Sequence, residues 1–323
     1  MNNDNYALKY RLGIDIGGTN TVLGLVDPDG NISERKTIPT CGHPELEDYL
    51  RSIGHAFREM KTYLPDGSII AGCGVGAPCA NQSTGCIEGA TNMPWKGVIP
   101  IARLLEEELG IPTTLGNDAN VAAAGEWMFG AAKGLANFIM LTLGTGVGGA
   151  IVADGHLLVG SRGFAAELGH VTLGEGYDRE CPCGRRGCLQ TYCQAEGVVK
   201  TAIELLEQYD TPSKLREVAL DDLSAKVIAE AANEGDALAI ETYRITGEIL
   251  GEATANFLAV TDPDAVILFG GVSKAGELIT KPMKEAMERK ALFLYKDRVR
   301  ILTSQHFGAE AAILGAAALA EAL

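Results

Sequence analysis

The sequence predicts an α/β protein built from two lobes. The chain has 323 residues, of which 46% are hydrophobic and 21% are charged, a composition typical of a globular protein with a large buried core. Apolar strand-like runs alternate with helical segments along most of the chain, and this alternation is typical of parallel or mixed sheets covered by helices. Two similar hairpins about half a chain apart indicate that the lobes arose by duplication.

The two hairpins share one plan: an apolar strand, a glycine-containing turn and a second apolar strand. Residues 11–27 read RLGIDIGGTNTVLGLVD, and residues 138–154 read FIMLTLGTGVGGAIVAD. Strand-like runs on both sides of a short glycine turn predict β-hairpins.

The alternating elements follow in order along the chain. Further strands are expected at residues 69–77, 113–115, 265–268 and 299–302. Helices are expected where apolar residues recur at helical spacing or alanine is abundant, at residues 44–63, 99–109, 120–129, 195–208, 223–233, 236–258, 280–290 and 309–323. We place the boundary near Gly116, with a small lobe of residues 1–116 and a large lobe of residues 117–308. The last helix, residues 309–323, is expected to pack back on the small lobe.

The formal net charge of −15 argues against some partners. An acidic surface repels DNA and RNA, so nucleic acid is not an expected partner. The first twelve residues are polar, unlike a signal peptide, and the uncharged stretches 67–87 and 134–153 are broken by glycines and polar residues, unlike a membrane helix. We expect a cytoplasmic protein that does not contact membranes.

Three glycine loops are candidate nucleotide-binding elements. Glycine lets a phosphate approach the backbone, and a carboxylate at a strand end is a suitable ligand for Mg²⁺. Each loop alone is equally compatible with a plain turn, whereas three together favour a clasp around ATP. The chain has neither the GxxxxGK[ST] pattern nor a GxGxxG that opens a helix, which argues against P-loop and Rossmann sites. The candidate residues are Asp15, Gly17, Gly18, Thr19, Asn20, Gly144, Thr145, Gly146, Gly270 and Gly271.

The run Gly116-Asn117-Asp118-Ala119-Asn120 has two interpretations. An Asn or Asp before an alanine-rich helix is a common N-cap, worth roughly 1 kcal/mol. Alternatively, Asp118 is a general base that accepts the proton of an attacking hydroxyl group. From the residues alone, the cap is the favoured interpretation.

A histidine and a cysteine cluster predict a structural zinc site. His170, Cys181, Cys183 and Cys188 supply the four ligands of a tetrahedral Zn²⁺ ion, and a closed site of this kind leaves no position for an activated water. Free thiols or a redox pair are the alternatives, and Cys193 could replace one ligand.

Together these motifs resemble the ROK family of repressors and sugar kinases, within the actin-like ATPase superfamily, and most of all its bacterial glucokinases. The motifs are DIGGTNT at 15–21, GND at 116–118, LGTGVGGA at 143–150, ELGH at 167–170, CPCGRRGCLQ at 181–190 and FGGVS at 269–273. The resemblance implies a two-lobed, ribonuclease H-like fold with a nucleotide and sugar cleft between the lobes. It also implies a homodimer that uses Mg-ATP to phosphorylate the primary hydroxyl of a hexose, with glucose as the first candidate.

The resemblance assigns roles to individual residues. Asp118 matches the catalytic base. The matches to sugar contacts are Asn92, Asn117, Glu167, His170 and Gln190, and the matches to zinc ligands are His170, Cys181, Cys183 and Cys188. Gln190 departs from the family motif, which usually has Glu there. Since Gln loses the charge and gains an NH₂ donor, sugar choice or affinity can differ.

Other activities stay open at this point. The sugar could instead be N-acetylmannosamine, fructose, mannose, allose or N-acetylglucosamine. A sugar-responsive regulator without enzymatic activity is a second class, which the acidic charge and the short segment before the first strand disfavour. A chaperone or filament protein of the superfamily is a third class, which the sugar and cysteine motifs disfavour.

Overall fold

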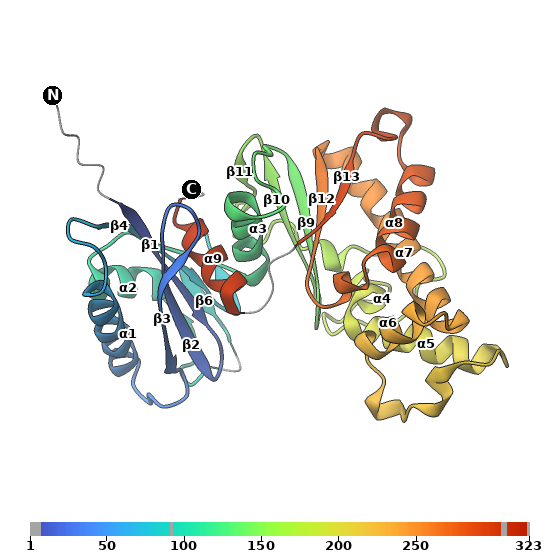
Figure 1. Cartoon of the computed structure of the whole chain (residues 1–323), viewed down its shortest axis with the longest axis horizontal. Helices are drawn as coiled ribbons and strands as arrows, with labels where there is room; N and C mark the ends of the chain where they lie inside the picture. Colours follow the sequence, from blue (N-terminus) through green and yellow to red (C-terminus); the bar gives the residue numbers. More distant parts are fainter. Residues whose placement is uncertain (1–7, 91–92, 305–308, 322–323) are drawn as a thin grey trace. The chain divides into compact units, whose positions relative to one another are not determined.

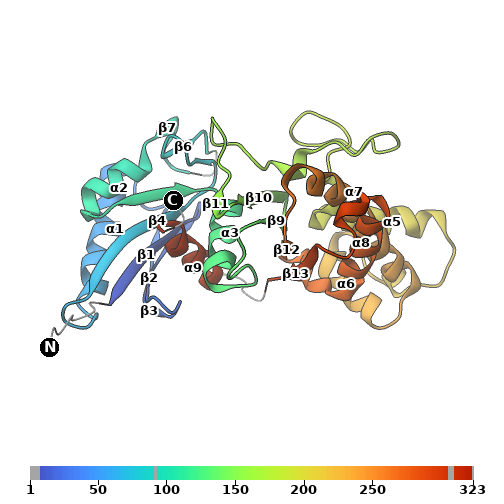
Figure 2. The same cartoon turned by 90° about the horizontal axis from the view of Figure 1, so that it is seen from above.

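The computed structural model describes three stretches of the chain, residues 8–90, 93–304 and 309–321. They form two compact units, each with its own sheet and hydrophobic core (Figures 1 and 2). The described residues of the first unit are 8–90, 93–134, 156–165 and 309–321, and those of the second unit are 135–155 and 166–304.

The first unit contains a mixed five-stranded sheet in the order β3-β2-β1-β4-β8. An antiparallel meander forms one side, and two strands parallel to β1 form the other. The bounds are β1 (Lys9–Ile16), β2 (Asn20–Val26), β3 (Ile32–Pro39), β4 (Ile69–Gly76) and β8 (Thr113–Gly116). A small second sheet is made of β5 (Ala80–Asn81), β6 (Cys86–Glu88) and β7 (Val98–Ile99).

One face of the first sheet is covered by two amphipathic helices, α1 (Leu46–Lys61) and α2 (Ile101–Leu109). Apolar side chains of α1 recur three or four residues apart, and those that are buried pack with Leu12 and Ile14 of β1 in a single core. Acidic residues in the first turn of α1 and basic residues in its last turn complement the helix dipole.

The opposite face of the sheet is lined by glycine, so a helix lies directly on the strands. A Cβ atom added to Gly13 would stand 2.3 Å from the carbonyl oxygen of Ile313, and one added to Gly74 would stand 1.7 Å from that of Ala316. Both carbonyls belong to α9 (Ala309–Leu319), the last helix of the described chain. Helix α9 therefore packs on the sheet of the first unit at backbone contact.

The expected lobe boundary near Gly116 lies inside the first unit. Directly after Gly116 the chain enters α3 (Asp118–Phe129), whose Gly125 packs against Gly315 of α9. This helix-to-helix contact groups residues up to 134 with the first unit, and the second unit begins at Leu135.

The sheet of the second unit repeats the plan of the first. Its hairpin is formed by β9 (Phe138–Leu143) and β10 (Val147–Ala153), and β12 (Ala265–Phe269) and β13 (Arg300–Thr303) follow parallel to β9. The order β10-β9-β12-β13 matches β2-β1-β4-β8, which agrees with the duplication inferred from the two hairpins. The short strand β11 (His156–Leu157) follows β10 in the chain.

The helices of the second unit pack with the strands in a single core. Gly247 and Gly251 let α7 approach α8 closely, since a Cβ atom at Gly251 would stand 2.2 Å from the carbonyl oxygen of Met283. The bounds are α4 (Gln190–Cys193), α5 (Ala195–Gln208), α6 (Ala225–Asn233), α7 (Ala237–Thr261) and α8 (Glu277–Lys290), with short 3-10 helices at Leu168–His170 (η1), Lys214–Glu217, Leu220–Asp222, Val272–Ala275 and Phe293–Tyr295. Among the described helices, none combines the length and the hydropathy that a membrane span requires.

Candidate functional site

The carboxyl ends of three parallel strands form one row in the first unit. Asp15 of β1 pairs with Gly76 of β4, and Gly76 pairs with Gly116 of β8. The chain then turns into α3, which places Asp118 two residues beyond this row. A Cβ atom at Gly76 would stand 3.8 Å from Oδ1 of Asp15, an ordinary contact distance, so this carboxylate lies directly beside the glycine.

Both carboxylates at this edge have raised pKa values. Burial raises the pKa of Asp15, and the negative charge of Asp118 raises it further. Burial also raises the pKa of Asp118, although its side chain remains accessible to solvent. A pair of neighbouring acids with raised pKa values is typical of sites that bind a cation or exchange a proton.

The N-cap of α3 is Asn117, and Asp118 is the first residue of the helix. Oδ1 of Asn117 accepts a hydrogen bond from the backbone N–H of Asn120 at 2.8 Å. Within the described part of the chain, no hydrogen bond engages the Asp118 carboxylate. The capping interpretation therefore applies to Asn117, and the carboxylate of Asp118 is left free for chemistry.

The first glycine turn is a tight connection between β1 and β2. The N–H of Gly17 donates to the carbonyl of Asn20 at 2.9 Å, and a Cβ atom at Gly17 would stand 2.9 Å from the same oxygen. The side chains of Thr19 and Asn20 are exposed at the tip. The turn thus offers hydroxyl and amide groups to a ligand at the same edge of the sheet as Asp15.

The second and third glycine loops lie side by side in the second unit. The second loop closes through a hydrogen bond from the N–H of Gly144 to the carbonyl of Gly146 at 3.0 Å, with Thr145 exposed at its tip. Gly270 has a φ of +103°, and a Cβ atom there would stand 2.5 Å from the carbonyl oxygen of Leu143, next to the turn. Only glycine combines this conformation with this proximity, so Gly270 brings the two loops together.

Two of the predicted sugar motifs meet at Val147, the first residue of β10. The backbone N–H of Val147 donates to Oε1 of Gln190 at 3.3 Å. A Cβ atom added to Gly169 would stand 1.9 Å from the carbonyl oxygen of Val147. Gly169 belongs to η1, next to Glu167 and His170. Gln190 and the segment with Glu167 and His170 therefore both lie close to Val147.

The four predicted zinc ligands converge. Their ligand atoms lie within 4.8 Å of one another, with 3.7 Å between Nδ1 of His170 and Sγ of Cys181 and 3.7 Å between the sulfurs of Cys183 and Cys188. Ligands about 2.3 Å from a tetrahedral Zn²⁺ ion are about 3.8 Å apart, so these spacings fit that ion. The alternative ligand Cys193 is excluded, because it is buried in the core and its thiol donates to the carbonyl of Thr246.

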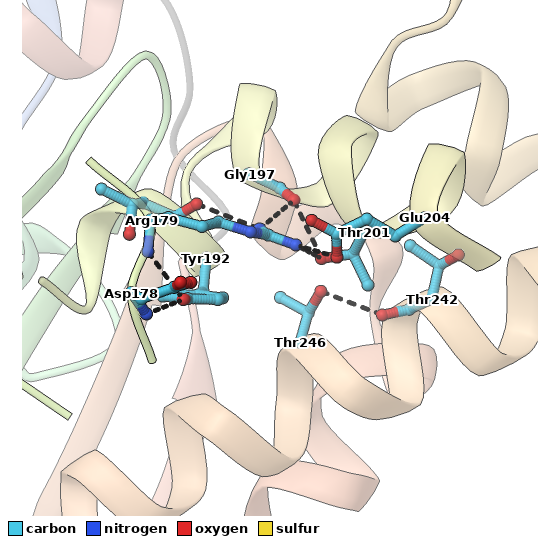
Figure 3. Close-up of polar contacts among 9 residues, drawn as sticks. Asp178, Arg179, Tyr192, Gly197, Thr201, Glu204, Thr242 and Thr246 are labelled. Carbon is cyan, nitrogen blue, oxygen red and sulfur yellow. Dashed lines mark hydrogen bonds and ion pairs between the residues drawn. The ribbon is translucent and has the colours of Figure 1, made fainter. Parts of the chain in front are cut away.

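The loop that carries the cysteines is fastened by Arg179, which sequence reasoning missed. Its guanidinium donates to the carbonyls of Thr191 and Gly197 and to the hydroxyl of Thr201, at 3.0 to 3.2 Å (Figure 3). It also lies 4.3 Å from the ring centroid of Tyr192, whose hydroxyl accepts the backbone N–H groups of Asp178 and Arg179. Nothing in the local pattern identifies Arg179, because its partners lie 12 to 25 residues further along the chain.

The predicted site residues thus form local clusters, each within one unit. Asp15 and the first turn share a sheet edge with Asp118, the second turn is adjacent to Gly270, and Gln190 is linked to the second turn through Val147. Asn92, a predicted sugar contact, lies outside the described residues.

Comparisons with known proteins show which family the chain resembles. The sequence model of the ROK family matches residues 11–322. A glucokinase from Halalkalibacterium halodurans is 35% identical over 316 residues, which cover 95% of this chain and 93% of that protein. The crystal structure of a ROK family glucokinase from Streptomyces griseus in complex with glucose and AMPPNP is 30% identical, has a TM-score of 0.73, and covers 97% of this chain and 99% of its own. That of a ROK hexokinase from Thermus thermophilus is 30% identical, has a TM-score of 0.78, and covers 97% and 98%.

The repeated sheets and these structural matches define the chain as a two-lobed actin-like ATPase fold, which confirms the predicted fold class. Within that class, the chain belongs to the ROK family.

Proposed function

We propose that this chain is an ATP-dependent hexokinase that transfers a phosphoryl group to the primary hydroxyl of glucose. The observation that carries the proposal is the Asp118 carboxylate, which is accessible, free of protein hydrogen bonds in the described chain, and close enough to Asp15 to raise that residue's pKa. The glucokinase relatives, one of them in complex with glucose and AMPPNP, support the choice of sugar and nucleotide.

Asp118 is the proposed general base. It accepts the proton of the primary hydroxyl as that oxygen attacks the terminal phosphorus, which makes the oxygen a better nucleophile. Because desolvation raises the pKa of Asp118, its carboxylate is a stronger base than that of an unperturbed aspartate.

Asp15 is the proposed ligand of a hydrated Mg²⁺ ion. Its oxygen donor, its place at a strand end and its raised pKa fit a hard divalent cation, which would offset the repulsion between Asp15 and Asp118. When bound with ATP, Mg²⁺ neutralises charge on the phosphates.

The three glycine loops are the proposed ATP contacts, with exposed Thr19, Asn20 and Thr145 as side-chain donors. The proposed sugar contacts are Asn92, Asn117, Glu167, His170 and Gln190. Since Oδ1 of Asn117 already accepts the capping hydrogen bond, its NH₂ group is the part left to donate to a sugar oxygen.

The Cys/His cluster is the proposed site of a structural Zn²⁺ ion, held by His170, Cys181, Cys183 and Cys188. Nδ1 of His170 lies 3.7 Å from Sγ of Cys181, so Nε2 is the ring nitrogen that would donate to a sugar hydroxyl. We further propose a cytoplasmic homodimer whose partners are ATP and a hexose, without nucleic acid or membrane.

The test is a coupled ADP-release assay of the wild-type chain and Asp118→Asn over glucose, mannose, fructose, allose, N-acetylglucosamine and N-acetylmannosamine. We expect turnover with glucose and a loss of about 10²–10⁴-fold in kcat for the variant, with calorimetric glucose affinity retained. Near-normal turnover of the variant contradicts the role of Asp118. If only another sugar is phosphorylated, that sugar takes the place of glucose as the proposed substrate. If ATP is consumed at the same rate whichever sugar is present, the kinase proposal is contradicted.

A further inference from the structure

The amide of Gln190 has a fixed orientation. The backbone N–H of Val147 donates to the Gln190 head group at 3.3 Å, and only Oε1 of an amide can accept that hydrogen bond. The contact is close because the turn residue beside it is Gly146, where a Cβ atom would stand 3.1 Å from Oε1. The carbonyl end of the side chain therefore points at β10, and the NH₂ end points elsewhere.

The NH₂ end is available to a ligand. In the part of the chain that the structure describes, no protein group accepts a hydrogen bond from Nε2 of Gln190. The side chain of Gln190 is half-buried, and Nε2 is not one of the buried side-chain atoms without a partner in the described chain. Nε2 is therefore exposed to solvent. A donor that is held in place and left unpaired is suited to an acceptor on a bound molecule.

The backbone beneath Gln190 is held firmly. Gln190 opens α4, and Arg179 grips the next two residues through the carbonyl of Thr191 and the ring of Tyr192 (Figure 3). The carbonyl of Gln190 itself accepts from the N–H of Gln194 at 3.0 Å. Rotation of the amide would break the hydrogen bond with Val147. Because the backbone of Gln190 is held in place, it cannot move to restore that hydrogen bond.

We propose that Gln190 donates a hydrogen bond from Nε2 to the sugar, so that the hydroxyl group it contacts must act as an acceptor. This inference rests on the proposed hexokinase function. It makes Gln190 a specificity-determining residue, because a sugar substituent that only accepts hydrogen bonds can occupy the position that Gln190 contacts. A carboxylate in place of the amide would still accept the Val147 N–H with one oxygen, but would present a second acceptor to the sugar and demand a donor there.

The test replaces single hydroxyls of glucose by fluorine, which accepts a hydrogen bond weakly and never donates one. The values of kcat/KM for 1-, 2-, 3- and 4-deoxyfluoroglucose, relative to glucose, are compared between the wild type and Gln190→Glu. Position 6 is left out because it is the reacting hydroxyl. Gln208→Glu adds the same charge at the exposed end of α5 and is the matched control.

At one position we expect a small loss in the wild type and in the control, and a loss in Gln190→Glu that is larger by about 10-fold, which corresponds to one charge-assisted hydrogen bond. Equal fluorine losses in wild type and Gln190→Glu at every position overturn the inference, as does a larger loss in the wild type. Zinc content and circular dichroism show that the variants are folded. A wild type that phosphorylates no hexose overturns the proposed function, and the inference with it. Turnover of a different hexose moves the same fluorine series to that sugar and leaves the comparison intact.

Discussion

Removing the Arg179 guanidinium should loosen the loop that carries the zinc ligands. Arg179→Met keeps the apolar stem and deletes the hydrogen bonds to Thr191, Gly197 and Thr201. The carbonyl of Gly197 still receives the hydroxyl of Thr201 at 3.0 Å, so the carbonyl of Thr191 is the group that loses its side-chain donor. The effect should therefore be centred on α4.

The magnitude follows from the contacts. A hydrogen bond from a charged group to a buried carbonyl contributes about 1.5–3 kcal/mol, and a cation over an aromatic ring contributes about 0.5–1 kcal/mol. The ion pair with Glu204 adds about 0–1 kcal/mol, since the glutamate side chain is 59% exposed. Because these contributions are not additive, we expect the free energy of unfolding to fall by about 2–4 kcal/mol.

Urea unfolding, zinc stoichiometry and steady-state kinetics form the assay. We expect Arg179→Met to raise KM for the sugar more than it lowers kcat, since Arg179 acts by positioning α4 and the Gln190 that it carries. Arg179→Lys should recover only part of the stability, because an ammonium group lacks the planar fork of donors. The control is Arg186→Met, which removes an exposed arginine that pairs with exposed Glu180 in the same loop. If both methionine variants show equal stability and equal KM, the reasoning is refuted.

Three further predictions concern the charge, the metal and the packing. Asp15→Asn should lower turnover yet raise stability at neutral pH: a raised pKa means that ionised Asp15 destabilises the fold once pH exceeds its unfolded-state pKa, and unfolding curves from pH 4 to 8 should show the gain disappear towards low pH. Cys183→Ser should lose bound zinc and at least about 2 kcal/mol of stability, whereas Cys86→Ser should keep both; one zinc per chain in Cys183→Ser would contradict the ligand set. Gly74→Ala should cost about 1–3 kcal/mol by pushing α9 off the sheet, against little effect for Gly72→Ala on the same strand, and equal unfolding midpoints would count against that packing.

The sequence was sufficient where function depends on local chemistry. Glycine turns between apolar runs predicted both hairpins, and the spacing of three cysteines after a histidine predicted a cluster that the structure brings together. The order of parallel strands explains why residues as distant as Asp15 and Asp118 meet, since strand ends align at one edge of a sheet.

Features set by tertiary contacts were not predictable. Strand β3 alternates between half-buried and exposed residues and carries Glu34, Arg35 and Lys36, so no apolar run in the sequence predicts this strand. Which of two adjacent polar residues caps α3 depends on backbone angles, and the extended conformation of Asn117 (φ −75°, ψ 168°) decides it. The extent of the first unit to residue 134 depends on the contact of α3 with α9, across nearly two hundred residues of sequence.

The duplicated sheets explain why only one copy supplies an acid to the proposed metal site. Asp15 is the second-last residue of β1, and Thr142 holds the same place in β9. The hydroxyl of Thr142 accepts a hydrogen bond from the N–H of Gly148 at 3.1 Å, so its oxygen takes part in hydrogen bonding within its own hairpin. Beside Asp15 the neighbouring strand places Gly76, whereas beside Thr142 it places Phe269. In the first copy the strand end carries a carboxylate that no group of the described residues engages in a hydrogen bond, and its register partner is a glycine; in the second it carries a hydroxyl that accepts a hydrogen bond, and its register partner is Phe269. The same fold therefore places an acid near the strand end of one unit and a hydroxyl at the matching position of the other, and only the acid suits the proposed Mg²⁺ ion.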